Sequence, residues 1–175
     1  MVTTSALPAR AEERLEALRI ELPLPPSPLG AYVEAVQSGN LLFLSGILPV
    51  ENGKPRYTGT IGKTLSPEEA RAAARLACVN AIAVAREHLG SLDRVRRVIR
   101  LGVSLVAVSD FTDHPRIADG ASELLVDVFG ESGTGTRIVL GVATLPLGVP
   151  VELELIFEVT DQNTEGHQRL RGTIR

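Results

Sequence analysis

Apolar residues recur at helical spacing in two long segments of the chain. The first segment opens with Ser66-Pro67-Glu68-Glu69, which combines a capping serine, proline at the first helical position and glutamate at the third. Small apolar residues then follow at intervals of three and four, and Gly90 ends the run after Leu89. The second segment opens at Asp113-His114-Pro115 and ends at Gly130. We therefore predict two helices, one from Ser66 to about Leu89 and one from Asp113 to Gly130.

Alternating apolar and polar residues predict strands around these helices. Ser38, Gly39 and Asn40 separate two strand-like runs, as expected for a tight hairpin. A long alternating run lies between the helices, and two more strands follow the second helix. The five predicted strands are Tyr32–Gln37, Leu41–Ser45, Ile99–Val108, Arg137–Ala143 and Val151–Val159. The order hairpin, helix, strand, helix, strand, strand predicts an α+β fold, in which two helices cover one face of a mixed sheet.

The last predicted strand separates apolar from charged residues. Its apolar set, from Val151 to Val159, points toward the helices, whereas Glu152, Glu154 and Glu158 point the other way. On the preceding strand Arg137, Val139, Gly141 and Ala143 share one face, and we place that face on the same side of the sheet as these glutamates. The resulting open face mixes apolar residues with specific charges, and we interpret it as a surface for self-association.

Residues 1–28 differ in character from the rest of the chain. An amphipathic pattern over Ala9–Leu22 predicts a short helix, and four prolines at positions 23, 25, 26 and 28 then predict an extended connector. We expect the main domain over residues 29–159. The remaining residues, 160–175, form a polar tail that we expect to be mobile.

Composition narrows the classes of function. The chain has 175 residues, 44% of them hydrophobic, a net charge of −3 and a single cysteine, Cys78. One cysteine excludes an internal disulfide framework, and the chain has no apolar run of membrane-spanning length, so we expect a soluble cytoplasmic protein. The acidic balance and an aromatic content of 3% make nucleic acid an unfavoured partner.

Few residues are candidates for chemistry. The three histidines, His88, His114 and His167, do not have metal-ligand spacing, and we expect neither a metal nor a cofactor. Arg137 opens a strand directly after a glycine-rich loop, where its guanidinium can bind a small carboxylate through two parallel hydrogen bonds. We expect Glu154 on the adjacent strand of a hairpin. A cross-strand arginine and glutamate are more often a structural ion pair than a catalytic pair, so the residues alone leave both interpretations open.

Several short motifs resemble the RidA/YjgF family. They are Gly30-Ala31-Tyr32, the run Gly39-Asn40-Leu41-Leu42-Phe43-Leu44-Ser45-Gly46 followed by Pro49, Asn80, Arg137, and Leu145-Pro146 leading to Val151-Glu152-Leu153-Glu154. The resemblance covers about Leu29 to Val159. It implies a chorismate-mutase-like fold, a homotrimer, and clefts between subunits that bind a small carboxylate-bearing metabolite.

The resemblance also implies an activity and its residues. Many members hydrolyse reactive enamines and imines to 2-keto acids and ammonia, and others carry an endoribonuclease label. By this resemblance Arg137 holds the substrate carboxylate, Glu154 positions water, and Tyr32 and Ser45 line the cleft. Ile47, Ile138 and Val139 depart from the family pattern and make the cleft more apolar, which indicates a divergent branch. A non-catalytic trimer that binds or senses a metabolite is therefore the alternative function, and RNA cleavage ranks third because the chain offers no converging histidine pair.

Overall fold

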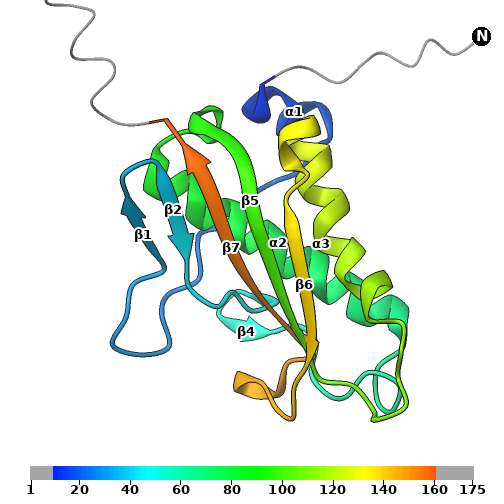
Figure 1. Cartoon of the computed structure of the whole chain (residues 1–175). Helices are drawn as coiled ribbons and strands as arrows, with labels where there is room; N and C mark the ends of the chain where they lie inside the picture. Colours follow the sequence, from blue (N-terminus) through cyan, green and yellow to red (C-terminus); the bar gives the residue numbers. More distant parts are fainter. Residues whose placement is uncertain (1–9, 161–175) are drawn as a thin grey trace, which may run out of the picture.

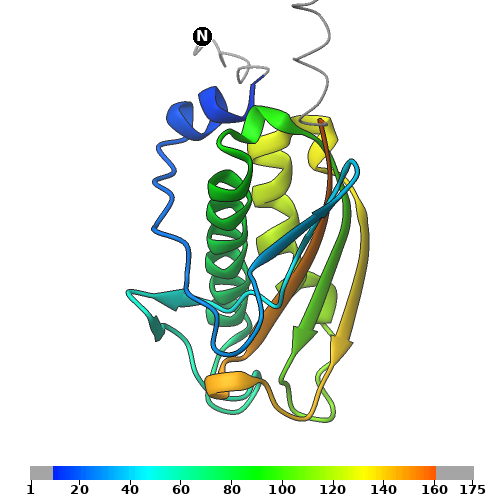
Figure 2. The same cartoon turned by 90° about the vertical axis from the view of Figure 1, so that its left-hand side faces the viewer.

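The structure is a computed structural model that describes residues 10–160. Two long helices, α2 (Pro67–Leu89) and α3 (His114–Phe129), form one layer behind the sheet (Figures 1 and 2). The helix α2 begins at the predicted capping box, in which Ser66 and Glu69 each accept a hydrogen bond from the other's backbone N–H. Gly90 ends the helix in the left-handed conformation with φ 78°. Both predicted helices are confirmed almost to the residue.

One five-stranded sheet, in the order β1-β2-β7-β5-β6, forms the second layer. Its strands are β1 (Ala35–Ser38), β2 (Leu41–Leu44), β5 (Val95–Leu105), β6 (Thr136–Gly141) and β7 (Val151–Val159). A small ribbon of β3 (Val50–Glu51) and β4 (Lys54–Pro55) lies beside it, and three short 3-10 turns occupy Leu92–Arg94, Gly130–Gly133 and Pro146–Gly148. The predicted α+β class and the hairpin across Gly39 are confirmed.

The predicted hairpin of the last two strands is wrong. The central strand β5 lies between β6 and β7, pairing parallel with β6 and antiparallel with β7. Register with β5 therefore sets which way each β6 side chain points. Arg137 and Leu155 both pair with Leu101, so Arg137 lies on the helix side of the sheet, whereas Ile138 lies on the open side. The predicted grouping of Arg137 with the glutamates of the open face is therefore wrong.

The core fills the space between the sheet and the two helices. Along β7 the residues Val151, Leu153, Leu155, Phe157 and Val159 are buried, as predicted from their alternation. The two helices approach closely at Gly120, where an added Cβ would lie 2.2 Å from the backbone oxygen of Arg71. The absence of a side chain at Gly120 on α3 thus allows the two helices to pack closely.

The N-terminal helix α1 (Ala11–Ala17) is shorter than the predicted span Ala9–Leu22. The chain leaves the helix at Leu18 and turns through Arg19, which has a φ of 54°. Leu15 of α1 is buried in the same core as the main helices. The extended, proline-rich segment that follows runs down the outside of the helix layer toward the hairpin (Figure 2). Ala9 and nearly all of the predicted tail lie outside the described residues.

Within residues 10–160, no helix has the length and apolar character needed to cross a lipid bilayer.

Candidate functional site

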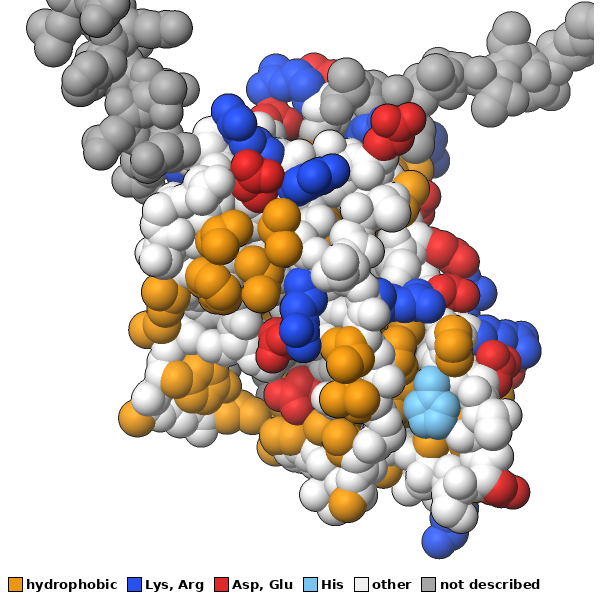
Figure 3. Space-filling view, in the orientation of Figure 1, with side chains coloured by type: hydrophobic (Ala, Val, Ile, Leu, Met, Phe, Trp, Pro, Cys, Tyr) orange, Lys and Arg blue, Asp and Glu red, His pale blue; other side chains and the backbone are white. Residues whose placement is uncertain are grey.

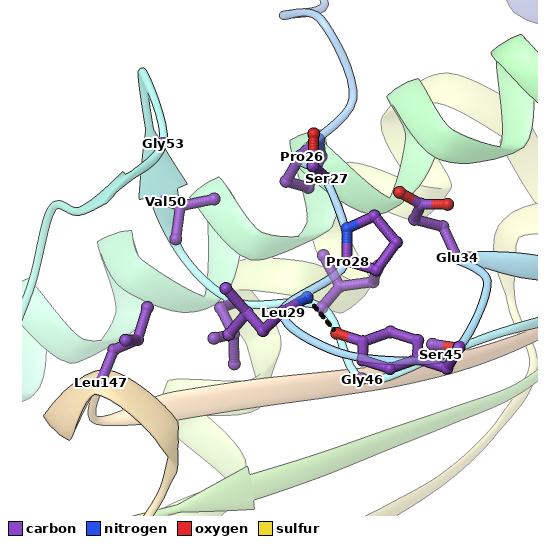
Figure 4. Close-up of a pocket in the computed structure, with 13 residues that line it drawn as sticks. Pro26, Ser27, Pro28, Leu29, Glu34, Ser45, Gly46, Val50, Gly53 and Leu147 are labelled. Atoms are coloured by element: carbon purple, nitrogen blue, oxygen red, sulfur yellow. Dashed lines mark hydrogen bonds between the residues drawn. The ribbon is translucent and has the colours of Figure 1, made fainter.

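A pocket lies where the proline-rich segment, residues 23–28, meets the first hairpin (Figure 4). It has a volume of about 250 Å³. Its walls come from four places in the sequence: residues 26–29 and 32–34, residues 45–50, Gly53 in the β3–β4 turn, and Leu147 in the turn before β7. The fold therefore assembles one hollow from segments that are more than a hundred residues apart.

Tyr32 and Ser45, both predicted as site residues, line this pocket together. The Tyr32 hydroxyl oxygen accepts a hydrogen bond from the backbone N–H of Leu29 over 3.0 Å, three residues earlier in the chain. Ser45 donates from its hydroxyl to the backbone oxygen of Val33 over 2.6 Å. These bonds orient two hydroxyl groups at one end of the hollow.

Glu152 lies in an adjoining hollow, which Tyr32, Ser45 and Gly46 also line. Burial raises the pKa of the Glu152 carboxyl above its ordinary value. The carboxyl sits directly over Gly46, where an added Cβ would lie 2.0 Å from Glu152 Oε1. A side chain at position 46 would therefore displace this carboxylate from the place it occupies.

Glu154, the glutamate singled out from the sequence, is placed two residues further along β7. It lies on the open face of the sheet, where its Oε1 is 3.5 Å from Nε of Arg100. Gly46 and Glu152 border the same open-face groove, together with Ile138 and Leu140 of β6. Both glutamates thus share one face, but Glu152 is the one beside Tyr32 and Ser45.

Arg137 lies apart from these groups. From the edge strand β6 it donates from Nη1 to Asp119 Oδ1 over 2.7 Å and to Ser122 Oγ over 3.0 Å, both on α3. The structure therefore does not bring Arg137 and Glu154 together within one chain, because they lie on opposite faces of the sheet with β5 between their strands.

Asn80 of α2 holds one wall of the pocket in place through hydrogen bonds. It is the buried polar side chain of the core, and its Nδ2 donates to the backbone oxygens of Leu48 and Val50, each over 2.9 Å. These two residues line the pocket. The helix α2 thereby holds the segment between Gly46 and β3 in place.

Sequence reasoning named Tyr32 and Ser45 as lining residues but did not name Glu152 or Gly46, which line the same hollow. Glu152 and Gly46 are both present in the motifs quoted above, yet alternation places Glu152 and Glu154 on the same face and does not distinguish them. The distinguishing contact is long-range. A backbone bridge between Ile47 and Leu153 sets Gly46 beside Glu152.

Comparison with known proteins shows to which protein family the chain belongs. Residues 12–159 match the family model described as "YjgF/chorismate_mutase-like, putative endoribonuclease". The chain belongs to this family, and its mixed sheet with helices on one side is the corresponding α+β fold.

Three relatives show how the chain relates to other members. It is 38% identical over 153 residues to Protein TCP17 of Trypanosoma cruzi, covering 87% of this chain and 96% of that protein. It is 32% identical over 141 residues to a 2-iminobutanoate/2-iminopropanoate deaminase of Dermatophagoides farinae, covering 80% and 94%. A solved structure titled "putative endoribonuclease" from Shewanella oneidensis is 35% identical, with a TM-score of 0.83 over 86% of this chain and 99% of that one.

Proposed function

We propose that this protein hydrolyses 2-imino acids to 2-keto acids and ammonia. The observation that carries the proposal is the convergence of Tyr32, Ser45 and the carboxyl of Glu152 around one hollow. A carboxyl whose pKa is raised by burial holds a proton more readily than an exposed carboxyl, which suits a group that accepts and returns a proton. A relative that shares 32% identity is named for this activity.

The chemistry requires little from the protein because a protonated imine is already electrophilic. Water attacks C2, a C–O bond forms, and the π electrons of the C=N bond move to nitrogen. The Glu152 carboxylate takes the proton of the attacking water and passes it to the nitrogen. The C–N bond then breaks, ammonia leaves, and loss of the hydroxyl proton yields the 2-keto acid. Orientation and proton transfer are the contributions asked of the site.

We propose Arg137 as the anchor of the substrate carboxylate, contributed by a second copy of the chain. Within one chain the guanidinium lies on the other side of the sheet from Glu154. An interface that brings β6 of one copy to the hollow of another joins the two halves. Such an arrangement repeated around a threefold axis produces a homotrimer with three equivalent clefts.

Glu154 is the alternative candidate for handling the proton. Its ion pair with Arg100 on the open face lies beside Glu152 in the same groove. The comparison of Glu152→Gln with Glu154→Gln decides which carboxylate handles the proton. We expect the larger loss of turnover from Glu152→Gln, and the reverse order would assign the role to Glu154.

The direct test generates 2-iminobutanoate with a threonine dehydratase and follows the release of keto acid. We expect the wild-type protein to accelerate release and Arg137→Ala to abolish the acceleration. Equal rates with and without the protein would reject the enzymatic proposal.

Mixing two inactive variants tests the shared site. In mixed trimers of Arg137→Ala and Glu152→Gln, some clefts combine an intact arginine from one copy with an intact glutamate from another. If the residues come from different copies, random mixing restores about a quarter of the clefts. If they come from the same copy, every cleft stays defective and no activity returns.

A non-catalytic metabolite-binding trimer is the second candidate. The apolar lining around Ile47 and Leu48 favours it, since such a cleft holds a ligand with few polar partners. Calorimetric titration with 2-keto acids that shows Arg137-dependent binding, together with an inactive imine assay, would select this function.

A further inference from the structure

The pocket of about 250 Å³ extends away from Glu152. The hollow that holds Glu152 shares a wall with this pocket, formed by Leu29, Tyr32, Ser45, Gly46 and Leu48. A molecule whose reacting carbon lies near Glu152 can therefore extend a substituent past this shared wall.

The wall of the pocket is mostly apolar. Leu29 and Leu48 contribute aliphatic side chains next to the hollow of Glu152, and Val50 and Leu147 contribute them outside that hollow. Pro26 and Pro28 complete the wall (Figure 4). Its lining contains no lysine, arginine or histidine, and the carboxylate of Glu34 stands at its margin. A negatively charged substituent is disfavoured here, whereas a hydrocarbon substituent is removed from water.

The proline-rich segment makes this wall of the pocket stiff. Pro26 and Pro28 fix their own φ angles and restrict the residues that precede them. The residues that follow this segment are held in two ways: the Tyr32 hydroxyl accepts a hydrogen bond from Leu29 N–H, and Ser45, directly after β2, donates to the backbone oxygen of Val33. A wall held in this way is formed before the ligand arrives, so little ordering entropy opposes binding.

We propose that the proline-rich segment and residues 45–50 form a side-chain pocket that selects 2-imino acids bearing an aliphatic group of several carbons. The proposal rests on the proposed function and specifies its substrate class. A methyl substituent fills only a small part of the volume and leaves the aliphatic walls in water. A branched group of four carbons covers these walls and removes them from water.

The test compares imines generated from alanine and from leucine by an amino-acid oxidase. We expect kcat/KM for the leucine-derived imine to exceed that for the alanine-derived imine by about tenfold or more. The variant Val50→Trp places an indole in the pocket but outside the hollow that holds Glu152, and it should bring the ratio of the two kcat/KM values close to one. Leu24→Trp is the control for the added indole, because Leu24 is 93% exposed and does not line the pocket.

A second measurement separates this proposal from the proposed function. Calorimetry compares the binding of 4-methyl-2-oxopentanoate and pyruvate, the keto acids that correspond to the two imines. Activity on both imines without a preference for the larger, or a preference that Val50→Trp leaves unchanged, overturns the proposed side-chain pocket but not the proposed hydrolase activity. Tighter binding of the larger keto acid without turnover upholds the pocket and rejects the hydrolase. If the wild-type protein neither binds nor turns over any of these compounds, both proposals fail.

Discussion

Arg137 and Asp119 form an ion pair across the edge of the sheet, with 2.7 Å between Nη1 and Oδ1. Ser122 accepts a second hydrogen bond from the same nitrogen over 3.0 Å. Within residues 10–160, the edge of the guanidinium formed by Nε and Nη2 has no such partner. Arg137 is therefore held by one nitrogen while the pair of donors suited to a carboxylate stays available.

Asp119 should weaken the binding of anions at Arg137. The side chains of Arg137 and Asp119 are 28% and 44% exposed, so the effect is small. We expect Asp119→Asn to keep the hydrogen bond, remove the negative charge and tighten the binding of a 2-keto acid by roughly twofold to fivefold. Calorimetric titration measures the change, and Arg137→Ala is the control that loses binding. Weaker binding by Asp119→Asn would mean that the ion pair is needed to position the guanidinium.

Glu152 should make the stability of the protein depend on pH. Because burial raises its pKa above the ordinary value of 4.5, the folded protein holds this proton more tightly than the unfolded chain does. The stability contributed by the site therefore falls as pH rises from that value through the raised pKa. Glu152→Gln should be more stable than the wild type at neutral pH, with the difference vanishing near pH 4. Urea unfolding at a series of pH values measures it, and a difference that does not change with pH would contradict the expectation.

Asn80 should contribute strongly to folding stability. Replacing it with alanine removes the donor for two backbone oxygens beneath the pocket, those of Leu48 and Val50. We expect a loss of about 1–3 kcal/mol in the free energy of unfolding, measured by urea denaturation. Asn40→Ala is the matched control, because Asn40 makes an exposed contact of 3.4 Å with Glu158 and should change stability by less than about 0.5 kcal/mol. Equal losses would show that burial of Asn80 does not matter.

The open face of the sheet should be the surface of self-association. Hydrophobic side chains gather over β1 and β2 and again over β6, with charged groups between them (Figure 3). Exposed members are Val36, Phe43, Ile138 and Leu140. We expect a trimer of the wild type at micromolar concentration in sedimentation analysis and dissociation of Leu140→Glu. Val126→Glu is the control, since Val126 is 41% exposed, close to the 51% of Leu140, but lies on α3. A monomeric wild type would remove the basis for a shared cleft.

The protein should not cleave single-stranded RNA. Metal-free cleavage needs a general base and a general acid near the 2′-hydroxyl, and the net charge of −3 does not attract the phosphate backbone. We expect no degradation above that of a matched Arg137→Ala sample in moderate salt. Cleavage that survives repeated purification and disappears in this variant would place the nuclease activity first.

The local elements of this protein could be predicted from its sequence because their signals lie close together in the chain. The capping residues Ser66 and Glu69 and the terminal Gly90 define α2, and each acts within one turn of the helix. Alternation along β7 correctly separates Leu155 from Glu154, because neighbouring side chains of a strand always point to opposite faces.

Only the tertiary structure decided which strand lies beside β6 and which glutamate faces the pocket. A strand's own alternation specifies two sets of residues but does not say which set faces the core. For β6 that choice came from pairing with β5, which turned Arg137 toward Asp119 on α3. Pairing across the sheet also brought Gly46 beside Glu152. These contacts join residues tens of positions apart, and their energies depend on how the whole core packs, which no local pattern encodes.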